Sequence, residues 1–174
     1  IQTTIDTLAY RMMEKYNKEH AIVYNTYQFY QHETLSSFKS AYLQAKQQGY
    51  YLGGKLVRGA YMEKERIRAK ENKYIDPIHQ TKEDTDQDYN GAIDFALEHL
   101  EIISLCLGTH NEFSTQYCAY KMAKLNVAKN DPRVWFAQLL GMSDNISFNL
   151  SNAGYNVAKY VPYGPIKSVI PYLI

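Results

Sequence analysis

Hydrophobic and polar positions follow two alternating patterns along the chain. Apolar residues recur at helical spacing in four segments, which are residues 5–16, 35–49, 89–100 and 114–126. Short β-rich or apolar runs predict strands at residues 21–28, 55–61, 104–110, 134–142 and 157–163. A short helix is expected near 144–153, and a last helix begins after Pro165. The polar stretch 63–84 contains Pro77 and predicts part helix and part loop.

This alternation predicts a parallel sheet built from βα units, either open and doubly wound or part of a barrel. Polar or glycine residues gather where several strands end, at Asn25, Arg58-Gly59, Thr109-His110-Asn111, Gly141 and Pro162. Chemistry at the carboxyl ends of successive strands is typical of the (β/α)8 barrel, which takes about 250 residues when complete. With 174 residues, the sequence predicts an α/β fold with an incomplete TIM-like barrel, and residues 1–174 form one domain.

Composition excludes several classes of function. The formal net charge is +1, from 19 basic and 18 acidic residues, and no basic stripe supplies a footprint for nucleic acid. No apolar run approaches the roughly 20 residues that cross a bilayer, and residues 1–10 do not read as a signal peptide. Cys106 and Cys118 show neither metal-ligand nor disulfide spacing, which favours a reducing compartment. No metal site is expected, because no histidine pair fits a ligand motif.

Two segments place candidate chemistry at strand ends. In KLVRGAYMEKER (55–66), Arg58 stands beside Gly59 and Ala60, where the backbone can approach a ligand closely. A buried strand that simply ends in a turn explains the same pattern. In GTHN (108–111), a Thr, a His and an Asn offer several hydrogen-bonding groups within one turn, although a lone histidine is more often structural.

Two tyrosines mark the last predicted strand and helix. Tyr160 and Tyr172 lie in KYVPYGPIKSVIPYLI (159–174), and their rings can converge on one pocket or pack in an ordinary interface. A dinucleotide fingerprint is excluded, because the glycine-rich segment 49–54 precedes a strand and does not join a strand to a helix.

These segments, together with QLLGMSDNISFNLSNAGY (138–155), occur in an order and at intervals that resemble the proline dehydrogenases. The resemblance covers essentially the whole chain. It implies roughly strands four to eight of a distorted (β/α)8 barrel, with FAD over the carboxyl ends of the strands. The implied activity is oxidation of L-proline to 1-pyrroline-5-carboxylate with hydride transfer to FAD. A barrel hosts many activities, so the motifs carry this inference and the fold does not.

The resemblance also implies roles for particular residues. Lys55 takes the position of a cation that stabilises negative charge on the reduced flavin. Contacts to FAD are implied for Asn25, Arg58, Gly59, Ala60, Thr109, His110 and Asn111. Contacts to the substrate are implied for Tyr61, Leu139, Tyr160 and Tyr172.

Several expectations concern partners and the chain boundaries. In the family, two consecutive arginines follow the Tyr172 segment and hold the substrate carboxylate, and earlier strands supply a lysine and an aspartate. This chain ends at Ile174, so we expect it to be inactive alone and, because an open half-barrel exposes strand edges, to self-associate. The resemblance implies a quinone acceptor with peripheral membrane contact, and a location in the bacterial cytoplasm or on the mitochondrial matrix side.

The sequence leaves two other functions open. One is a different flavin barrel that resembles methylenetetrahydrofolate reductase, against which the tyrosine pair argues. The other is a non-catalytic barrel fragment that serves as a structural or binding module.

Overall fold

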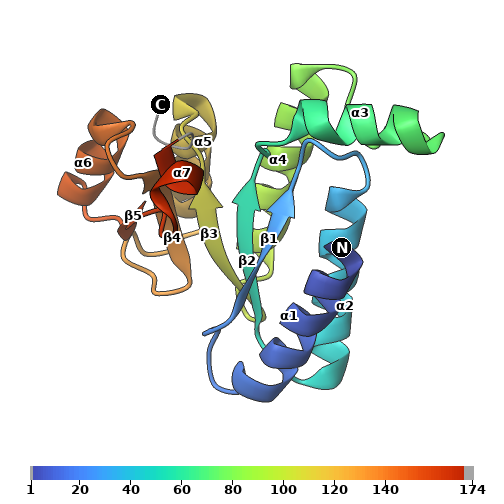
Figure 1. Cartoon of the computed structure of the whole chain (residues 1–174). Coiled ribbons are helices and arrows are strands. Elements are labelled where there is room, and N and C mark those ends of the chain that lie inside the picture. Colours follow the sequence, from blue (N-terminus) through green and yellow to red (C-terminus); the bar gives the residue numbers. More distant parts are fainter. Residues whose placement is uncertain (1, 171–174) are drawn as a thin grey trace.

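Five parallel strands form one sheet in the computed structural model, which describes residues 2–170. The strands are β1 (Tyr24–Gln28), β2 (Leu52–Val57), β3 (Ile103–Gly108), β4 (Val134–Leu139) and β5 (Val157–Tyr160). They lie side by side in the order β1-β2-β3-β4-β5, as Figure 1 shows. A doubly wound sheet reverses its strand order at a switch point. The sequential order here is that of a barrel wall, so the prediction of an incomplete barrel is confirmed.

Helices connect the strands and cover one face of the sheet. They are α1 (Gln2–Tyr16), α2 (Thr34–Gln48), α3 (Met62–Asn72), α4 (Lys82–Glu98), α5 (Glu112–Lys124), α6 (Asp144–Asn152) and α7 (Ile166–Val169). The polar stretch 63–84 holds most of α3, a loop and the start of α4, as the sequence predicts. In Figure 1, α3 lies beyond the ends of β1 and β2.

Helix ends follow local sequence signals. Gly49 adopts a left-handed conformation (φ 69°) and ends α2, with its N–H donating to the Ala45 carbonyl. Thr81 begins α4 by accepting a hydrogen bond from the Asp84 N–H at 3.1 Å. These caps fix where each helix meets the sheet.

The core lies between the sheet and its helices. Leu56, Leu105 and Leu107 are fully buried and face Phe38 of α2 and Ile93 of α4 as parts of one cluster. Because side chains alternate along a strand, Lys55 and Val57 point to the opposite face. Cys106 pairs in register with Lys55 and shares that face. The sheet therefore has one apolar face under helices and one mixed face.

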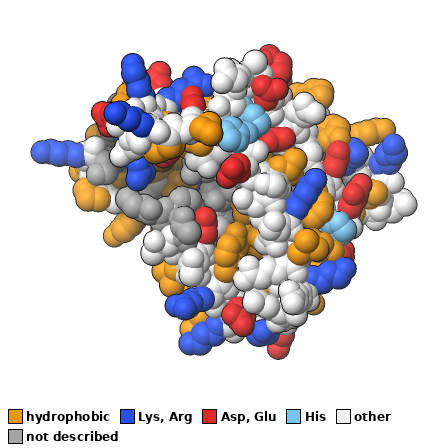
Figure 2. Space-filling model, turned by 90° about the vertical axis from the view of Figure 1, so that its right-hand side faces the viewer, with side chains coloured by type: hydrophobic (Ala, Val, Ile, Leu, Met, Phe, Trp, Pro, Cys, Tyr) orange, Lys and Arg blue, Asp and Glu red, His pale blue; other side chains and the backbone are white. Residues whose placement is uncertain are grey.

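The surface carries charges of both signs. Figure 2 shows basic and acidic side chains interspersed with hydrophobic ones over the displayed face. Among residues 2–170, no helix combines the length and the apolar character that crossing a bilayer requires.

Replacing a core leucine tests the packing of the sheet. Leu105→Ala removes a fully buried side chain from the central strand and is expected to lower the free energy of unfolding by about 3 kcal/mol. Leu43→Ala, on the exposed side of α2, serves as the matched control and should change it by less than about 0.5 kcal/mol. Urea unfolding followed by circular dichroism measures both. Equal effects would contradict this core.

Candidate functional site

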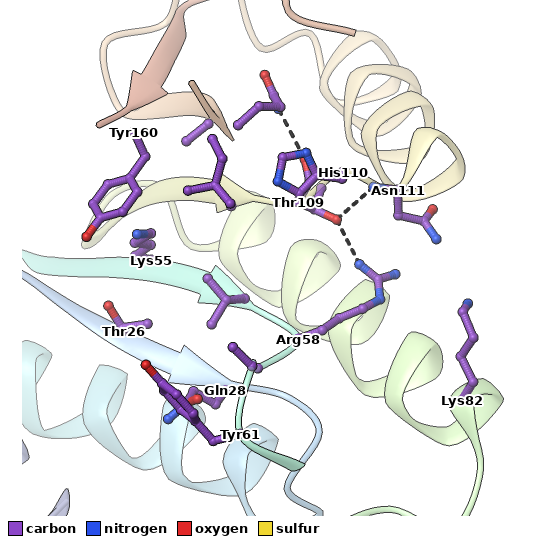
Figure 3. A pocket seen from close by; sticks show the side chains of 17 residues that line it. Thr26, Gln28, Lys55, Arg58, Tyr61, Lys82, Thr109, His110, Asn111 and Tyr160 are labelled. Atoms are coloured by element: carbon purple, nitrogen blue, oxygen red, sulfur yellow. Dashed lines mark hydrogen bonds between the residues drawn. The ribbon is translucent and has the colours of Figure 1, made fainter. Parts of the chain in front are cut away.

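A cavity of about 570 Å³ opens on the mixed face at the carboxyl ends of the strands. All five strands contribute lining residues, together with the segments that follow β2 and β3 and the first residue of α4. The edge of a parallel sheet at its carboxyl ends is where such folds place binding sites. Figure 3 shows side chains from these elements pointing into one space.

The structure brings most of the sequence-predicted residues to this cavity. The lining includes Lys55, Arg58, Gly59, Ala60, Tyr61, Thr109, His110, Asn111, Leu139 and Tyr160. Tyr172 lies outside the described residues. Four separate motifs thus meet in one place, although the strands that carry them lie far apart in sequence.

Asn25 is the exception, and the structure does not bring it to the cavity. Its side chain is buried on the helix side of β1 and donates to Asp6 of α1 at 2.9 Å. Thr26 and Gln28 line the cavity instead. Residues 25 and 28 are an odd number apart, so alternation along the strand puts them on opposite faces. The amide that β1 brings to the cavity is therefore that of Gln28, and the expectation that Asn25 lies there is corrected.

Gly59 is required by the turn that ends β2. Its φ is +124°, and a Cβ there would lie 1.7 Å from the Tyr30 ring. The Tyr30 N–H in turn donates to the Arg58 carbonyl at 2.7 Å. The chain can bend away from the sheet only because this position has no side chain.

Arg58 is held from several directions. Its Nε donates to Asp86 at 2.7 Å, Nη1 to the Thr109 hydroxyl at 2.9 Å, and Nη2 to the Ser114 hydroxyl at 2.9 Å. The guanidinium carbon stacks 4.3 Å above the centre of the Tyr89 ring. In Figure 3, Arg58 reaches from the end of β2 toward Thr109. The guanidinium therefore joins β2, α4 and the start of α5 behind the cavity wall.

The GTHN segment connects the end of β3 to the start of α5. The Asn111 side chain caps the helix by accepting from the Ser114 N–H at 2.9 Å. The Thr109 hydroxyl accepts from the Asn111 N–H at 3.1 Å as well as from Arg58. The amino end of α5 consequently lies at the cavity, and the helix dipole favours an anion there.

The surroundings of His110 favour the neutral form of its imidazole. Burial, and after it the positive charge of Lys159, lowers the pKa of His110 below its usual value of 6.5. Its Nδ1 lies 2.9 Å from the Ser143 hydroxyl. In its neutral form the imidazole can donate a hydrogen bond from one nitrogen and accept one at the other.

Lys55 and Tyr160 meet on the other side of the cavity. The Lys55 ammonium lies 4.4 Å from the centre of the Tyr160 ring, a cation–π contact between β2 and β5. Figure 3 shows the two side chains next to each other.

Cations dominate the lining. Lys55, Arg58 and Lys82 contribute three positive charges, and no Asp or Glu occurs among the described residues that line the cavity. No cluster of three or more His, Cys, Asp or Glu side chains suited to a metal ion occurs within residues 2–170. This charge distribution suits an anionic ligand.

Sequence reasoning missed Thr26, Gln28, Lys82 and Gln138 as lining residues. Gln28 could have been found from the alternation of side chains along β1. Tyr27 packs against Phe38 of α2, so its neighbour Gln28 points to the opposite face, where the cavity lies. Lys82 carries no such signal, because its place at the cavity follows from how α4 packs.

The comparisons with known proteins decide the family. The sequence model of the family described as proline dehydrogenase matches residues 1–174. The chain belongs to the proline dehydrogenase family. It is 42% identical to human proline dehydrogenase 1, mitochondrial, over 99% of this chain and 29% of that protein. The Drosophila melanogaster proline dehydrogenase 1, mitochondrial, is 41% identical over 99% of this chain and 27% of the relative.

Membership of the proline dehydrogenase family agrees with the resemblance that the four motifs carry, and it disfavours a barrel like methylenetetrahydrofolate reductase. The chain spans less than a third of the human and fly relatives. It is also 40% identical to the Xenopus laevis hydroxyproline dehydrogenase, over 94% of this chain and 36% of that protein.

A solved structure supports the fold of this proline dehydrogenase family member. Proline utilization A from Bdellovibrio bacteriovorus, inactivated by N-propargylglycine, superposes with a TM-score of 0.88 at 24% identity. The match covers 98% of this chain and 18% of that one. At this identity the likeness establishes the fold alone.

Substituting Gly59 tests the turn at the cavity. Gly59→Ala forces the Tyr30 ring to move and strains the backbone, so the free energy of unfolding should fall by about 3 kcal/mol. Gly141→Ala is the control, because its φ is +78° but nothing lies within 4 Å of the added Cβ. That variant should lose about 1 kcal/mol. Urea unfolding compares the two, and an equal loss would show that the Tyr30 contact does not matter.

The pKa of His110 offers a second test. Lys159→Met removes the positive charge that lowers this pKa, so the pKa should rise while staying below 6.5, because burial remains the larger cause. Lys124→Met, about 20 Å away along α5, should leave the pKa unchanged. NMR titration of the histidine ring protons measures both variants. An unchanged His110 pKa in Lys159→Met would contradict the assigned cause.

Proposed function

We propose that the protein containing this chain oxidises L-proline to 1-pyrroline-5-carboxylate with FAD as the cofactor. The observation that carries the proposal is the convergence of four motifs on one cation-lined cavity. Membership of the proline dehydrogenase family supports the choice of reaction. Proline would lose a hydride equivalent from the ring carbon and a proton from nitrogen, and bound FAD would supply the acceptor for the two electrons.

The residues at the cavity fit FAD. The diphosphate of FAD carries negative charge, and Arg58, Lys82 and the amino end of α5 supply positive charge and N–H donors. Gly59, Ala60 and Gly108 leave room for a flat ring system to approach the backbone. When bound, FAD would accept the hydride equivalent, and the protein would bind, orient and exclude water.

Lys55 is proposed to stabilise developing negative charge. Its ammonium reaches the cavity from the middle of the sheet, where Tyr160 holds it by a cation–π contact. A fixed cation in a partly desolvated site lowers the energy of a transition state that gains negative charge.

The substrate pocket is proposed to use Tyr61, Leu139 and Tyr160, with Tyr172 added from the resemblance. Apolar and aromatic faces suit the pyrrolidine ring, and enclosing it on several sides would hold it at reacting distance. The similarity to a hydroxyproline dehydrogenase makes 4-hydroxy-L-proline a necessary comparison substrate.

Further proposals concern the activity of residues 1–174 alone, the electron acceptor and the location of the protein. We infer that residues 1–174 alone are inactive toward proline and self-associate, because the chain spans less than a third of the length of its human and fly relatives. A quinone acceptor, peripheral membrane contact and a reducing compartment stay predictions. Relatives named mitochondrial favour the mitochondrial side of the two predicted locations.

The absorption spectrum of bound flavin tests the proposed function. Protein incubated with FAD and desalted should retain a flavin spectrum, and L-proline added without oxygen should bleach it. D-proline should leave it unchanged, and 4-hydroxy-L-proline should act more slowly. Retained flavin that L-proline does not bleach in the full-length protein would contradict the reaction. The same measurement on residues 1–174 tests whether this part suffices.

A variant of Lys55 tests its proposed role. Lys55→Met should slow flavin reduction by L-proline about 100-fold, with little change in FAD affinity. Lys129→Met is the matched control, because Lys129 also lies over a tyrosine ring, that of Tyr155 at 5.6 Å, away from the cavity. Stopped-flow absorbance gives the rates. Equal rates in Lys55→Met and wild type would remove Lys55 from the chemistry.

A further inference from the structure

Asp86 of α4 stands behind the cavity wall and is absent from the residues that line it. One of its carboxylate oxygens accepts from Arg58, and both Nε and Nη2 of Arg58 lie 2.7 Å from that oxygen. The other oxygen accepts from the Lys82 ammonium. One carboxylate therefore connects two of the three cations that line the cavity.

The contacts of Arg58 leave it little freedom. Hydrogen bonds to Asp86, Thr109 and Ser114 use one hydrogen each of Nε, Nη1 and Nη2, and Nη2 also lies 2.7 Å from the Asp86 carboxylate. Tyr89 covers one face of the guanidinium. Arg58 also lines the cavity, so its guanidinium can meet an anionic ligand there while these contacts hold it.

Ser114 completes the arrangement and links it to α4 a second time. Its hydroxyl accepts from Arg58 and donates to Asn90 at 2.8 Å. Asp86 and Asn90 are four residues apart, so they lie on the same face of α4. From this face of α4, Asp86 accepts a hydrogen bond from Arg58, and Asn90 accepts one from Ser114 of α5.

Lys82 depends on Asp86 more than Arg58 does. The Lys82 side chain is 67% exposed and Asp86 is its ion-pair partner one helical turn away, whereas the Arg58 side chain is 20% exposed and has several partners. An exposed lysine without a partner samples many rotamers in water. Asp86 thus keeps a flexible cation at the cavity rim.

We propose that Asp86 is a positioning residue, which acts through Arg58 and Lys82 to hold two cations in place for the anionic part of FAD. This inference rests on the proposed function, because it takes FAD as the ligand. Asp86 itself touches neither ligand nor substrate.

Two physical effects of removing Asp86 oppose each other. Losing a negative charge near the cavity favours an anion, whereas losing the partner of two cations releases their side chains. The direct contacts of Asp86 are with the cations and none is with the cavity, so the loss of orientation outweighs the gain in charge. Partners that orient binding groups from outside the contact layer typically contribute about tenfold or more to affinity.

The test compares Asp86→Asn with Asp88→Asn in the full-length protein. Asp88 lies on the same helix and pairs with His79 at 2.9 Å, and its side chain is 22% exposed against 27% for Asp86. Asp88 is absent from the cavity lining. Each variant therefore removes one carboxylate charge and its side-chain contact from the same helix, and only Asp86 contacts cations that line the cavity.

The dissociation constant for FAD, measured by quenching of flavin fluorescence, should rise about tenfold in Asp86→Asn and less than about twofold in Asp88→Asn. Asp86→Glu should recover part of the affinity. At saturating FAD, Asp86→Asn should regain the wild-type kcat and KM for L-proline, which a general structural defect would not allow.

Several outcomes would overturn the inference. Equal FAD affinity in Asp86→Asn and wild type would do so, and so would an equal loss in the two Asn variants. If Asp86→Asn does not fold, Ser114→Ala takes its place, and unchanged FAD affinity in that variant overturns the inference. A wild-type protein that binds no FAD would instead contradict the proposed function.

Discussion

The ion pair between Arg58 and Asp86 ties the sheet to the helices at the point where the cavity opens. Arg58 follows β2, Asp86 belongs to α4, and Thr109 and Ser114 bring in the end of β3 and the start of α5. A guanidinium suits this place because it is planar, always charged and able to donate in several directions at once. Without it, the buried hydroxyls of Thr109 and Ser114 would lose a partner. The geometry of the cavity wall depends on this one side chain.

Most of the fold follows from the sequence, because segments with apolar residues at helical spacing alternate clearly with short apolar runs that predict strands. Buried runs such as 103–108 are long enough for strands, and caps at Gly49, Thr81 and Asn111 end or begin helices in the usual way. Polar residues at the ends of several strands favoured a barrel over an open sheet, and the strand order, which no local pattern encodes, confirms it. Packing of distant segments decides that order, so only the structure could give it.

The candidate site shows the same division. Motifs at the ends of β2 and β3 predicted Arg58 and Thr109 at the cavity, because the carboxyl ends of parallel strands share one edge. Asn25 was assigned to the cavity although it faces α1, because β1 mixes aromatic and amide residues on both faces. Asp86 escaped sequence reasoning, since a contact across 28 positions along the chain has no periodic signal. Long-range pairing of polar groups is therefore the part that sequence reasoning reaches least.

We propose that FAD lies over the carboxyl ends of β2, β3 and β4, against the segments 58–61 and 108–112. Hydrogen–deuterium exchange with and without FAD tests this claim most directly. FAD bound at this place should slow the exchange of the amides in 58–61 and 108–112 and leave 128–133, at the opposite end of the sheet, unchanged. Protection confined to other segments, with none at 58–61 and 108–112, would contradict it.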